Sequence, residues 1–266
     1  MVHIETVLQN GKTTLKKSFC NTPFKIADIT EDRNKKELKL MMMCSSPGVL
    51  DGDEYNFQID IAEDCCMKME TQSYQRLFQM NTGASQCMTV NMCRGSSFIY
   101  LPHPLVPHRS SIFTSRNKIY MDENCSLIWG EVMSSGRGLN NEVFQFSSYH
   151  SVTEIFFRDK LVVKENLLVR PKEMKLTDIG HFEGYTHQAT MLYIHEAACN
   201  EELMKKLICE MELEQNISFG ISSLAVSGLV VRVLGHKAEQ LFLLLHRLSS
   251  LIECSAGVTV KTLVYV

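Results

Sequence analysis

Three residues near the middle of the chain, Glu131, Arg137 and Glu142, carry side chains that could do chemistry together. Glu131 lies in the apolar run 127–134, Glu142 begins the run 142–146, and Arg137 lies in the glycine- and asparagine-rich segment between them. This pattern predicts a strand, a loop and a second strand. Because strand side chains alternate between faces, both carboxylates are expected among apolar neighbours, where each needs a hydrogen bond, a cation or a proton. Arg137 is the nearest cationic candidate.

Two interpretations follow from these residue types alone. The first is a structural ion pair that fixes the hairpin, since ion-pair networks are a common reason for buried charge. The second is a glycosidase in which Glu131 and Glu142 act as acid and base, because β-helical folds also host polysaccharide-active enzymes. The glycosidase interpretation predicts an open, aromatic-lined groove around both glutamates.

Other chemistry has little support in the sequence. It contains no GxSxG, GxxxxGK[ST], GxGxxG or HExxH motif, and none of its ten cysteines forms a CxxC pair. Among the nine histidines, His103 and His108 flank a proline-rich stretch that could preset a metal site. Loop histidines without a shared ligand role are the alternative. The sequence therefore offers little support for enzymatic chemistry, and we expect no tightly bound cofactor.

The elements that must position these residues are mostly strands. Short strand-like runs recur between turn signals from residue 1 to about 195, and most of them alternate only loosely. Loose alternation suits strands that are buried on both sides or stacked in layers. A sandwich, a barrel or a solenoid would satisfy this pattern, and no fixed-period repeat is visible. We expect a mainly β fold with a β-rich body over residues 1–195.

The remaining residues, 196–266, are expected to form a smaller α+β part, although one domain over 1–266 is also allowed. Asn200 can cap a first helix with an apolar stripe over 203–211, and a leucine-rich helix is expected over 237–253. Between them, 217–234 predicts a strand pair broken near Gly228. The leucine stripe of the second helix is core or, alternatively, a docking face for a helical partner.

Composition and charge narrow the class of protein further. The chain has 266 residues, is 45% hydrophobic and 21% charged, and has a net charge of −3. It lacks a broad cationic field, so nucleic acid and anionic lipid are not favoured partners. It also lacks a secretory signal and a stretch of roughly 20 apolar residues for a membrane helix. We expect a cytoplasmic protein.

The segment that contains the two glutamates resembles the urease accessory proteins of the UreD family, also called UreH. In that family a glutamate-bearing strand runs into a GR loop and a second glutamate-bearing strand. Further stretches match in the same order, namely PFKI (23–26), SSPGVLDGD (45–53), TQSYQRLF (71–78), LPHPLVPH (101–108) and FEGYTH (182–187). Apart from the two glutamates and Arg137, the family-motif positions that we single out are Pro47, Gly48, Thr71, Gln72, Ser73, Gly136, Tyr185 and His187.

The resemblance implies an irregular β-helical stack with a few helices, and a non-enzymatic factor for urease maturation. It implies binding to apo-urease and recruitment of a UreF-like helical partner, through which a UreG-like GTPase docks and delivers nickel. A dimer of heterodimers within that complex stays open. Oxygen ligands along an enclosed polar path could hold nickel(II) transiently and release it. We expect Glu131 and Glu142 on that path, with Arg137 holding the hairpin in shape. A different β-rich module that binds a protein or a glycan is the remaining alternative.

Overall fold

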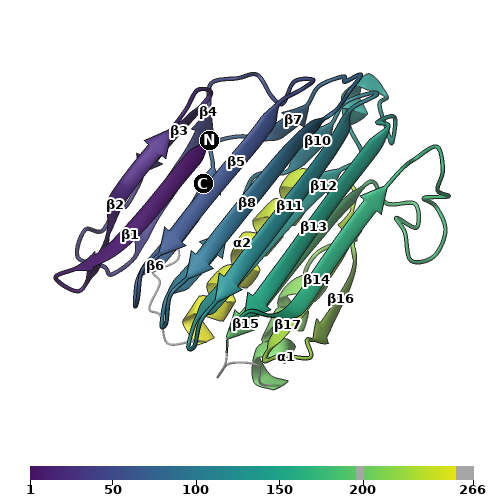
Figure 1. The fold of residues 1–266 in the computed structure, drawn as a ribbon. Coiled ribbons are helices and arrows are strands. Elements are labelled where there is room, and N and C mark those ends of the chain that lie inside the picture. The colour runs from purple at the N-terminus through teal and green to yellow at the C-terminus, as the bar shows by residue number, and fades with distance from the viewer. Residues whose placement is uncertain (196–200, 256–266) are drawn as a thin grey trace.

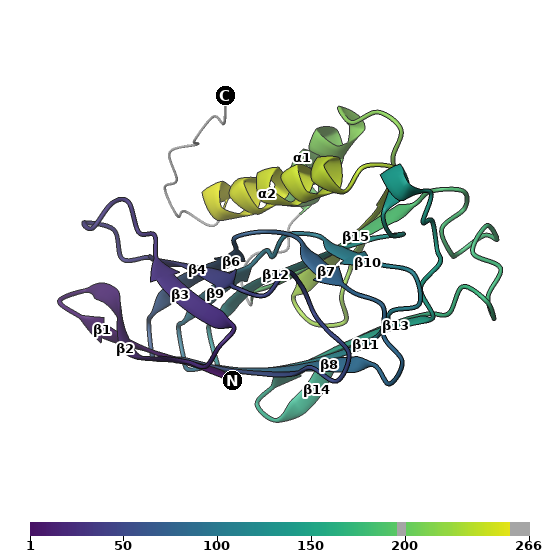
Figure 2. The ribbon, with the colours of Figure 1, turned by 90° about the horizontal axis from the view of Figure 1, so that it is seen from above.

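The computed structural model describes residues 1–195 and 201–255, and it shows two β-sheets that face each other (Figures 1 and 2). The seven-stranded sheet contains, in spatial order, β14 (Lys160–Val169), β13 (Ser148–Phe157), β11 (Ile112–Met121), β8 (Ala84–Met92), β5 (Glu54–Ile61), β1 (Val2–Gln9) and β2 (Lys12–Cys20). The ten-stranded sheet contains β16 (Ser218–Ser223), β17 (Gly228–Gly235), β15 (His187–His195), β12 (Ser126–Ser134), β9 (Ser97–Tyr100), β6 (Cys66–Thr71), β4 (Leu38–Cys44) and β3 (Phe24–Asp28), with β7 (Gln75–Leu77) and β10 (Leu105–Pro107) attached beside β12.

The middle of the chain coils from one sheet to the other and back. Within the seven-stranded sheet β5, β8, β11 and β13 pair in parallel, and within the ten-stranded sheet β4, β6, β9 and β12 do the same. Partner residues on successive coils, such as Glu54 and Ser85, Ala84 and Phe113, or Ile112 and Ser148, are 31, 29 and 36 residues apart. The predicted mainly β, solenoid-like stack is confirmed, and its uneven coils explain why no fixed repeat is visible.

The two sheets differ in what covers their outer faces. Strands of the seven-stranded sheet alternate between buried and partly exposed positions, as in β1 and β13, because their outer face meets solvent. β12 and β17 are buried on both faces along most of their length. Two helices, α1 (Glu201–Glu212) and α2 (Ala238–Ser255), lie over the outer face of the ten-stranded sheet (Figure 2). The loose alternation of the ten-stranded sheet therefore results from helices on one side and the facing sheet on the other.

Both predicted helices and the strand pair between them are confirmed, whereas Asn200 lies outside the described residues. The apolar stripe of α2 is core, because Leu241, Leu245 and Leu248 pack in a cluster with Ile128 and the helix α1. Gly130 on β12 leaves room for the side chains between β12 and α2. A Cβ added at Gly130 would lie 2.5 Å from Leu101 Cδ2 and 3.1 Å from Leu245 Cδ1. β17 pairs with β15, so the C-terminal residues continue the ten-stranded sheet.

The expected hairpin is wrong in its second strand. β12 spans Ser126–Ser134 as predicted, but it pairs with β9 and β15, and residues 142–146 form no strand. Asn141 and Phe144 have φ values of 57° and 52°, and such left-handed conformations break an extended strand. The segment instead forms a compact loop with the 3-10 helix η1 (Gly138–Asn140).

In the described part of the chain, no helix has the length and apolar character that a membrane span requires.

Candidate functional site

Glu131 points from β12 into the space between the two sheets. Its Oε1 accepts hydrogen bonds from Trp129 Nε1 at 3.0 Å and Asn117 Nδ2 at 3.1 Å, and it lies 3.4 Å from Thr153 Oγ1. Its Oε2 accepts a hydrogen bond from Ser151 Oγ at 3.1 Å. Strand alternation sets this arrangement, because Trp129 and Glu131 are two residues apart on β12, and Ser151 and Thr153 are two apart on β13. A carboxylate is thus held between sheets by neutral donors from three strands.

A small cavity of about 40 Å³ lies beside this carboxylate. Polar lining comes from Glu131, Ser151, Thr153, Glu165, Gln188 and Thr190, and apolar lining from Trp129, Met133, Tyr149, Leu167 and Leu192. Burial raises the pKa of Glu131 above its ordinary value, although the hydrogen bonds from Trp129 and Ser151 oppose this effect. Burial, together with the charge of Glu131, also raises the pKa of Tyr149. The cavity therefore places a buried carboxyl group with a raised pKa beside hydroxyl and amide side chains.

A second, larger cavity of about 210 Å³ collects five of the family-motif positions. Pro47 and Gly48 line it from the turn after β4, and Thr71, Gln72 and Ser73 line it from the end of β6 and the loop that follows. A Cβ added at Gly48 would lie 2.4 Å from the carbonyl oxygen of Arg76, so the turn can approach β7 this closely only at a glycine. These sequence-distant residues share one wall because the coils stack in parallel.

The two cavities meet at a pair of aromatic rings. Tyr100 lines the larger cavity and Trp129 lines the smaller one, and their ring centroids lie 4.7 Å apart. A polar contact continues into the larger cavity, where Gln75 Nε2 donates to Gln86 Oε1 at 3.0 Å. The interior between the sheets therefore contains two neighbouring cavities with mixed polar and apolar lining, and the Tyr100 and Trp129 rings lie where they meet.

Glu142 lies in the loop after β12 and has different partners from Glu131. Arg137 binds it in a bidentate manner, with Nε 2.8 Å from Oε2 and the terminal nitrogen 2.5 Å from Oε1. The Arg109 backbone amide donates to the same carboxylate at 3.3 Å. The Arg137 guanidinium holds the pKa of Glu142 below its ordinary value, opposed by partial burial. Among the contacts of the described residues, none joins Glu142 to Glu131, so the two carboxylates lie in separate surroundings.

Gly136 allows this loop to close. Its φ is +131°, and a Cβ there would lie 2.3 Å from the carbonyl oxygen of Glu142 and 3.0 Å from that of Pro107. Only glycine adopts such a conformation without strain. Arg137 and Glu142 thus fix the loop, while Gly136 permits its contact with the end of β10.

Tyr185 and His187 lie where the chain enters β15. The Tyr185 ring is 4.9 Å from the ring of His236, and His187 Nδ1 lies 2.8 Å from the hydroxyl of Thr186. Burial, reinforced by the nearby His236, lowers the pKa of His187 to about 4. His187 pairs across the sheet with Ser134, the last residue of β12. Tyr185 and His187 therefore pack at the start of β15, next to the end of β12 and the loop that contains Arg137.

Sequence reasoning missed the residues that surround Glu131, above all Asn117, Ser151 and Thr153. Each of them is buried on a strand whose alternate positions face the interior. A usable signal was present, because polar residues occupy interior positions of these strands at two-residue spacing, where an apolar side chain is the usual choice. His103 and His108, the candidate metal pair, pack against Phe242 and Phe78, respectively. Burial lowers the pKa of His108.

The fold and its interior define a β-solenoid protein in which two facing sheets have two cavities between them and two helices cover one outer face. The chain belongs to the UreD family, because the family model described as UreD urease accessory protein matches residues 1–261. It is 43% identical over 242 residues to the urease accessory protein UreD of Flavobacterium johnsoniae, covering 91% of this chain and 87% of that one. It is 34% identical to the UreD of Acetivibrio thermocellus over 90% of this chain and 92% of the relative, and 32% identical to that of Actinobacillus pleuropneumoniae over 93% and 94%.

Proposed function

We propose that this protein is a non-enzymatic maturation factor that acts in the cytoplasm on apo-urease. The observation that carries the proposal is the match to the UreD urease accessory protein family over almost the whole chain. In this function the protein binds apo-urease and a UreF-like helical partner, and a UreG-like GTPase docks through that partner and supplies nickel and energy. Two such assemblies can join as a dimer of heterodimers.

We further propose that nickel(II) passes through the interior as a transient guest. The space between the sheets supports this idea, since the smaller cavity is lined with carboxylate, hydroxyl and amide oxygens, which bind a divalent ion but exchange it readily. Glu131 is the central candidate, because among the contacts of the described residues its Oε2 accepts a hydrogen bond from Ser151 alone. Both oxygens of Glu142 are engaged by Arg137, so we assign this pair to holding the loop. Rotation of Tyr100 and Trp129 would connect the two cavities.

The carbohydrate-active alternative gains no support from the site. Its acid and base were to be Glu131 and Glu142, and these two carboxylates have separate partners in separate surroundings. The relatives are named accessory proteins. A glycan screen with the purified protein is the direct test of that alternative, and saturable binding of an oligosaccharide would revive it.

The first experiment is co-purification of this chain with apo-urease and the UreF-like protein of its host. Nickel content and urea hydrolysis are then measured with and without this chain. Complex formation together with dependence of activation on this chain supports the maturation function. Full activation in its absence contradicts it.

The nickel path is tested separately with Glu131→Gln. This change keeps the size of the side chain but removes its charge, so we expect assembly to persist and the nickel content of urease to fall. Glu154→Gln is the matched control, because Glu154 lies on β13 facing away from the interior and pairs with Lys164. Unchanged nickel content in the Glu131 variant would refute the path, and loss of assembly would show that Glu131 has a structural role.

A further inference from the structure

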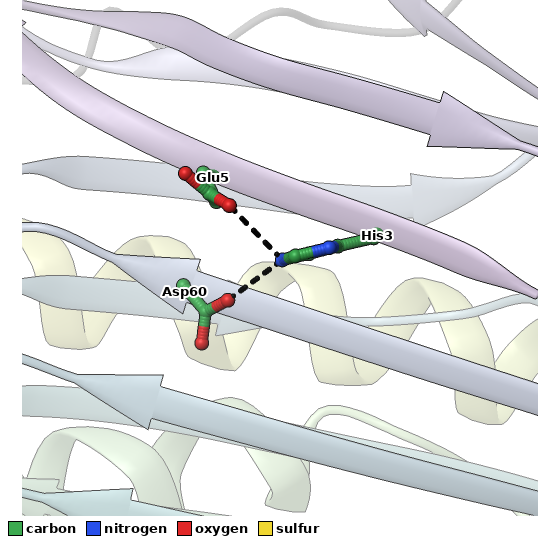
Figure 3. Close-up of side chains that lie close together, drawn as sticks. All are labelled: His3, Glu5 and Asp60. Carbon is green, nitrogen blue, oxygen red and sulfur yellow. Dashed lines mark hydrogen bonds and ion pairs between the residues drawn. The ribbon is translucent and has the colours of Figure 1, made fainter.

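A cluster of potential metal ligands lies on the outer face of the seven-stranded sheet, away from both cavities. His3 and Glu5 are two residues apart on β1 and share its outward face, because Val2 and Ile4 point into the core. Asp60 is the direct cross-strand partner of Glu5 in the parallel pairing of β1 with β5. The three side chains therefore meet on one surface (Figure 3).

The reactive atoms of these side chains converge on one point. His3 Nε2 lies 2.9 Å from Asp60 Oδ2 and 3.3 Å from Glu5 Oε1, and the three ligand atoms all lie within 4.8 Å of one another. Ligands about 2.0–2.2 Å from a zinc ion lie roughly 3–3.5 Å apart, so the present spacing is close to what coordination requires. The side chains are 18%, 23% and 35% exposed for His3, Glu5 and Asp60, which leaves an approach from solvent.

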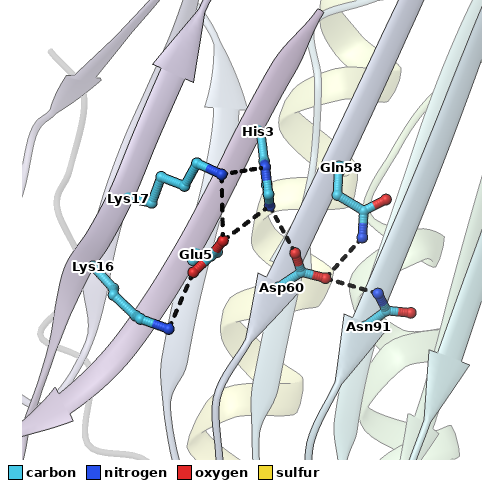
Figure 4. A network of polar contacts seen from close by, with 7 residues as sticks. All are labelled: His3, Glu5, Lys16, Lys17, Gln58, Asp60 and Asn91. Carbon is cyan, nitrogen blue, oxygen red and sulfur yellow. Dashed lines mark hydrogen bonds and ion pairs between the residues drawn. The ribbon is translucent and has the colours of Figure 1, made fainter.

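Neighbouring groups hold the other oxygen of each carboxylate. Gln58 Nε2 and Asn91 Nδ2 both donate to Asp60 Oδ1 at 2.7 Å, which leaves Oδ2 facing the centre (Figure 4). Lys16 Nζ lies 3.2 Å from Glu5 Oε2, which leaves Oε1 facing the centre. Outer partners of this kind orient the ligands of metal sites. Without a metal ion, Lys16 and Lys17 beside Glu5 offset the repulsion between the carboxylates of these directly paired residues.

The position of Lys17 should differ between the metal-free site and a site that holds a metal ion. Its ammonium lies 3.0 Å from His3 Nδ1 and can only donate there, so Nδ1 is an acceptor and the ring proton is on Nε2. A metal at Nε2 requires the other tautomer, with the proton on Nδ1. Lys17 also lies 3.6 Å from Glu5 Oε1, so it competes with a metal ion for both of these ligands and must move away when the site is loaded. A bulge in the β1–β2 pairing next to Glu5 brings both lysines to this side.

We propose that His3, Glu5 and Asp60 form a surface site for a borderline divalent transition-metal ion, such as zinc(II) or cobalt(II). One imidazole nitrogen and two carboxylate oxygens suit such ions, whereas calcium takes six to eight oxygen ligands. Water completes the coordination. The site lies outside the interior path, and it stands or falls independently of the proposed function.

The test is titration of the full-length protein with cobalt(II), monitored by calorimetry and by visible absorption. The absorption spectrum distinguishes coordination by histidine and carboxylate from coordination by thiolate. His3→Ala should weaken the strongest cobalt site by at least about tenfold, as loss of a ligand or its support does elsewhere. His150→Ala is the matched control, because His150 lies on the same outer face on β13 and contacts Asn166. This control should bind as the unaltered protein does.

Lys17→Gln provides a second, opposite result. Removal of the competing ammonium should tighten cobalt binding, whereas a role of Lys17 in stabilising the loaded site would weaken it. NMR adds a local readout, since paramagnetic cobalt should broaden the His3 ring signals and leave those of His150 unaffected. Equal affinity of the His3→Ala variant and the unaltered protein would overturn the proposal and leave the cluster as ion pairs that join β1 to β5.

Discussion

Replacement of Glu131 should separate the need for a hydrogen-bond acceptor from the need for a charge. In Glu131→Ala, Trp129 Nε1 and Ser151 Oγ lose the acceptor that the structure gives them. Asn117 and Thr153 still bond each other at 2.9 Å. Each buried donor left without a partner costs about 1–3 kcal/mol, and water in the adjoining cavity reduces this cost, so we expect a net loss of about 2–4 kcal/mol. At about 2–4 °C per kcal/mol, the Tm should fall by roughly 4–16 °C.

Glu131→Gln should behave differently. Its amide oxygen can accept from Trp129 and Asn117, and its amide nitrogen can donate to Ser151, so the loss should stay below about 1 kcal/mol at low pH. Because burial raises the pKa of Glu131, the folded protein holds this proton more tightly than the unfolded chain. The stability that Glu131 contributes is therefore present below its unfolded pKa and is lost as the pH rises through the folded pKa. Glutamine has no such dependence, so the variant should gain relative to the unaltered protein as pH rises.

Urea unfolding monitored by tryptophan fluorescence measures both variants, since Trp129 is the only tryptophan in the chain and itself contacts Glu131. Titrations at pH 5 and pH 8 give the sign of the pH effect. The reasoning is refuted if glutamine destabilises as much as alanine at both pH values, because the charge itself would then be the stabilising feature.

Three further outcomes follow from the geometry. Gly136→Ala should destabilise the protein by about 2–4 kcal/mol, because the backbone there has a positive φ and the new Cβ would clash with the carbonyl oxygens of Glu142 and Pro107. Thermal unfolding measures this loss, and Gly138→Ala is the control because a Cβ there meets open space. Equal Tm values for the two variants would contradict the clash. His187, with a pKa of about 4, should keep neutral-ring NMR shifts from pH 8 to pH 5, and a titration midpoint near 6.5 would contradict its burial. Asp51 has a pKa of about 2 because Thr82 and Gly83, in the turn before β8, donate hydrogen bonds to its carboxylate. Asp51→Asn should therefore lower the Tm at pH 7, and the loss should become smaller as the pH falls below about 4. An equal loss of Tm at every pH would contradict this account.

The sequence predicted local elements better than their partners. β12, both helices and the strand pair around Gly228 followed from apolar spacing, because burial acts residue by residue along an element. The partner of β12 did not follow, because parallel pairing joins residues about thirty positions apart, and the left-handed residue Asn141 gives no apolar signal. The solenoid came from the family resemblance alone, since coils of 29 to 36 residues carry no common period.

The candidate site was predicted in part for a similar reason. Glu131 was identified as a carboxylate among apolar neighbours, and it does lie between Trp129 and Met133 on the cavity wall. Its partners on the other strands are neutral residues of β11 and β13, whose polar side chains at interior positions were a signal that sequence reasoning did not use. The assignment of Arg137 to the Glu142 carboxylate agrees with their closeness in the sequence, since a five-residue loop brings them together. Contacts between coils depend on register, and register is a property of the whole stack.

The coiled order of the strands also sets a sequence of assembly. The larger cavity is built from residues 24–103, all from the first coils, whereas the smaller cavity needs residues from 129 to 192. Domains begin to form from the N-terminus during synthesis, and a stack whose parts contact mainly their neighbours can grow in that direction. The cavity beside Glu131 stays open until β15 pairs with β12, and α2 then closes the back of that sheet. During synthesis from the N-terminus, the cavity beside Glu131 is therefore sealed from water later than the larger cavity, because it needs strands as late as β15.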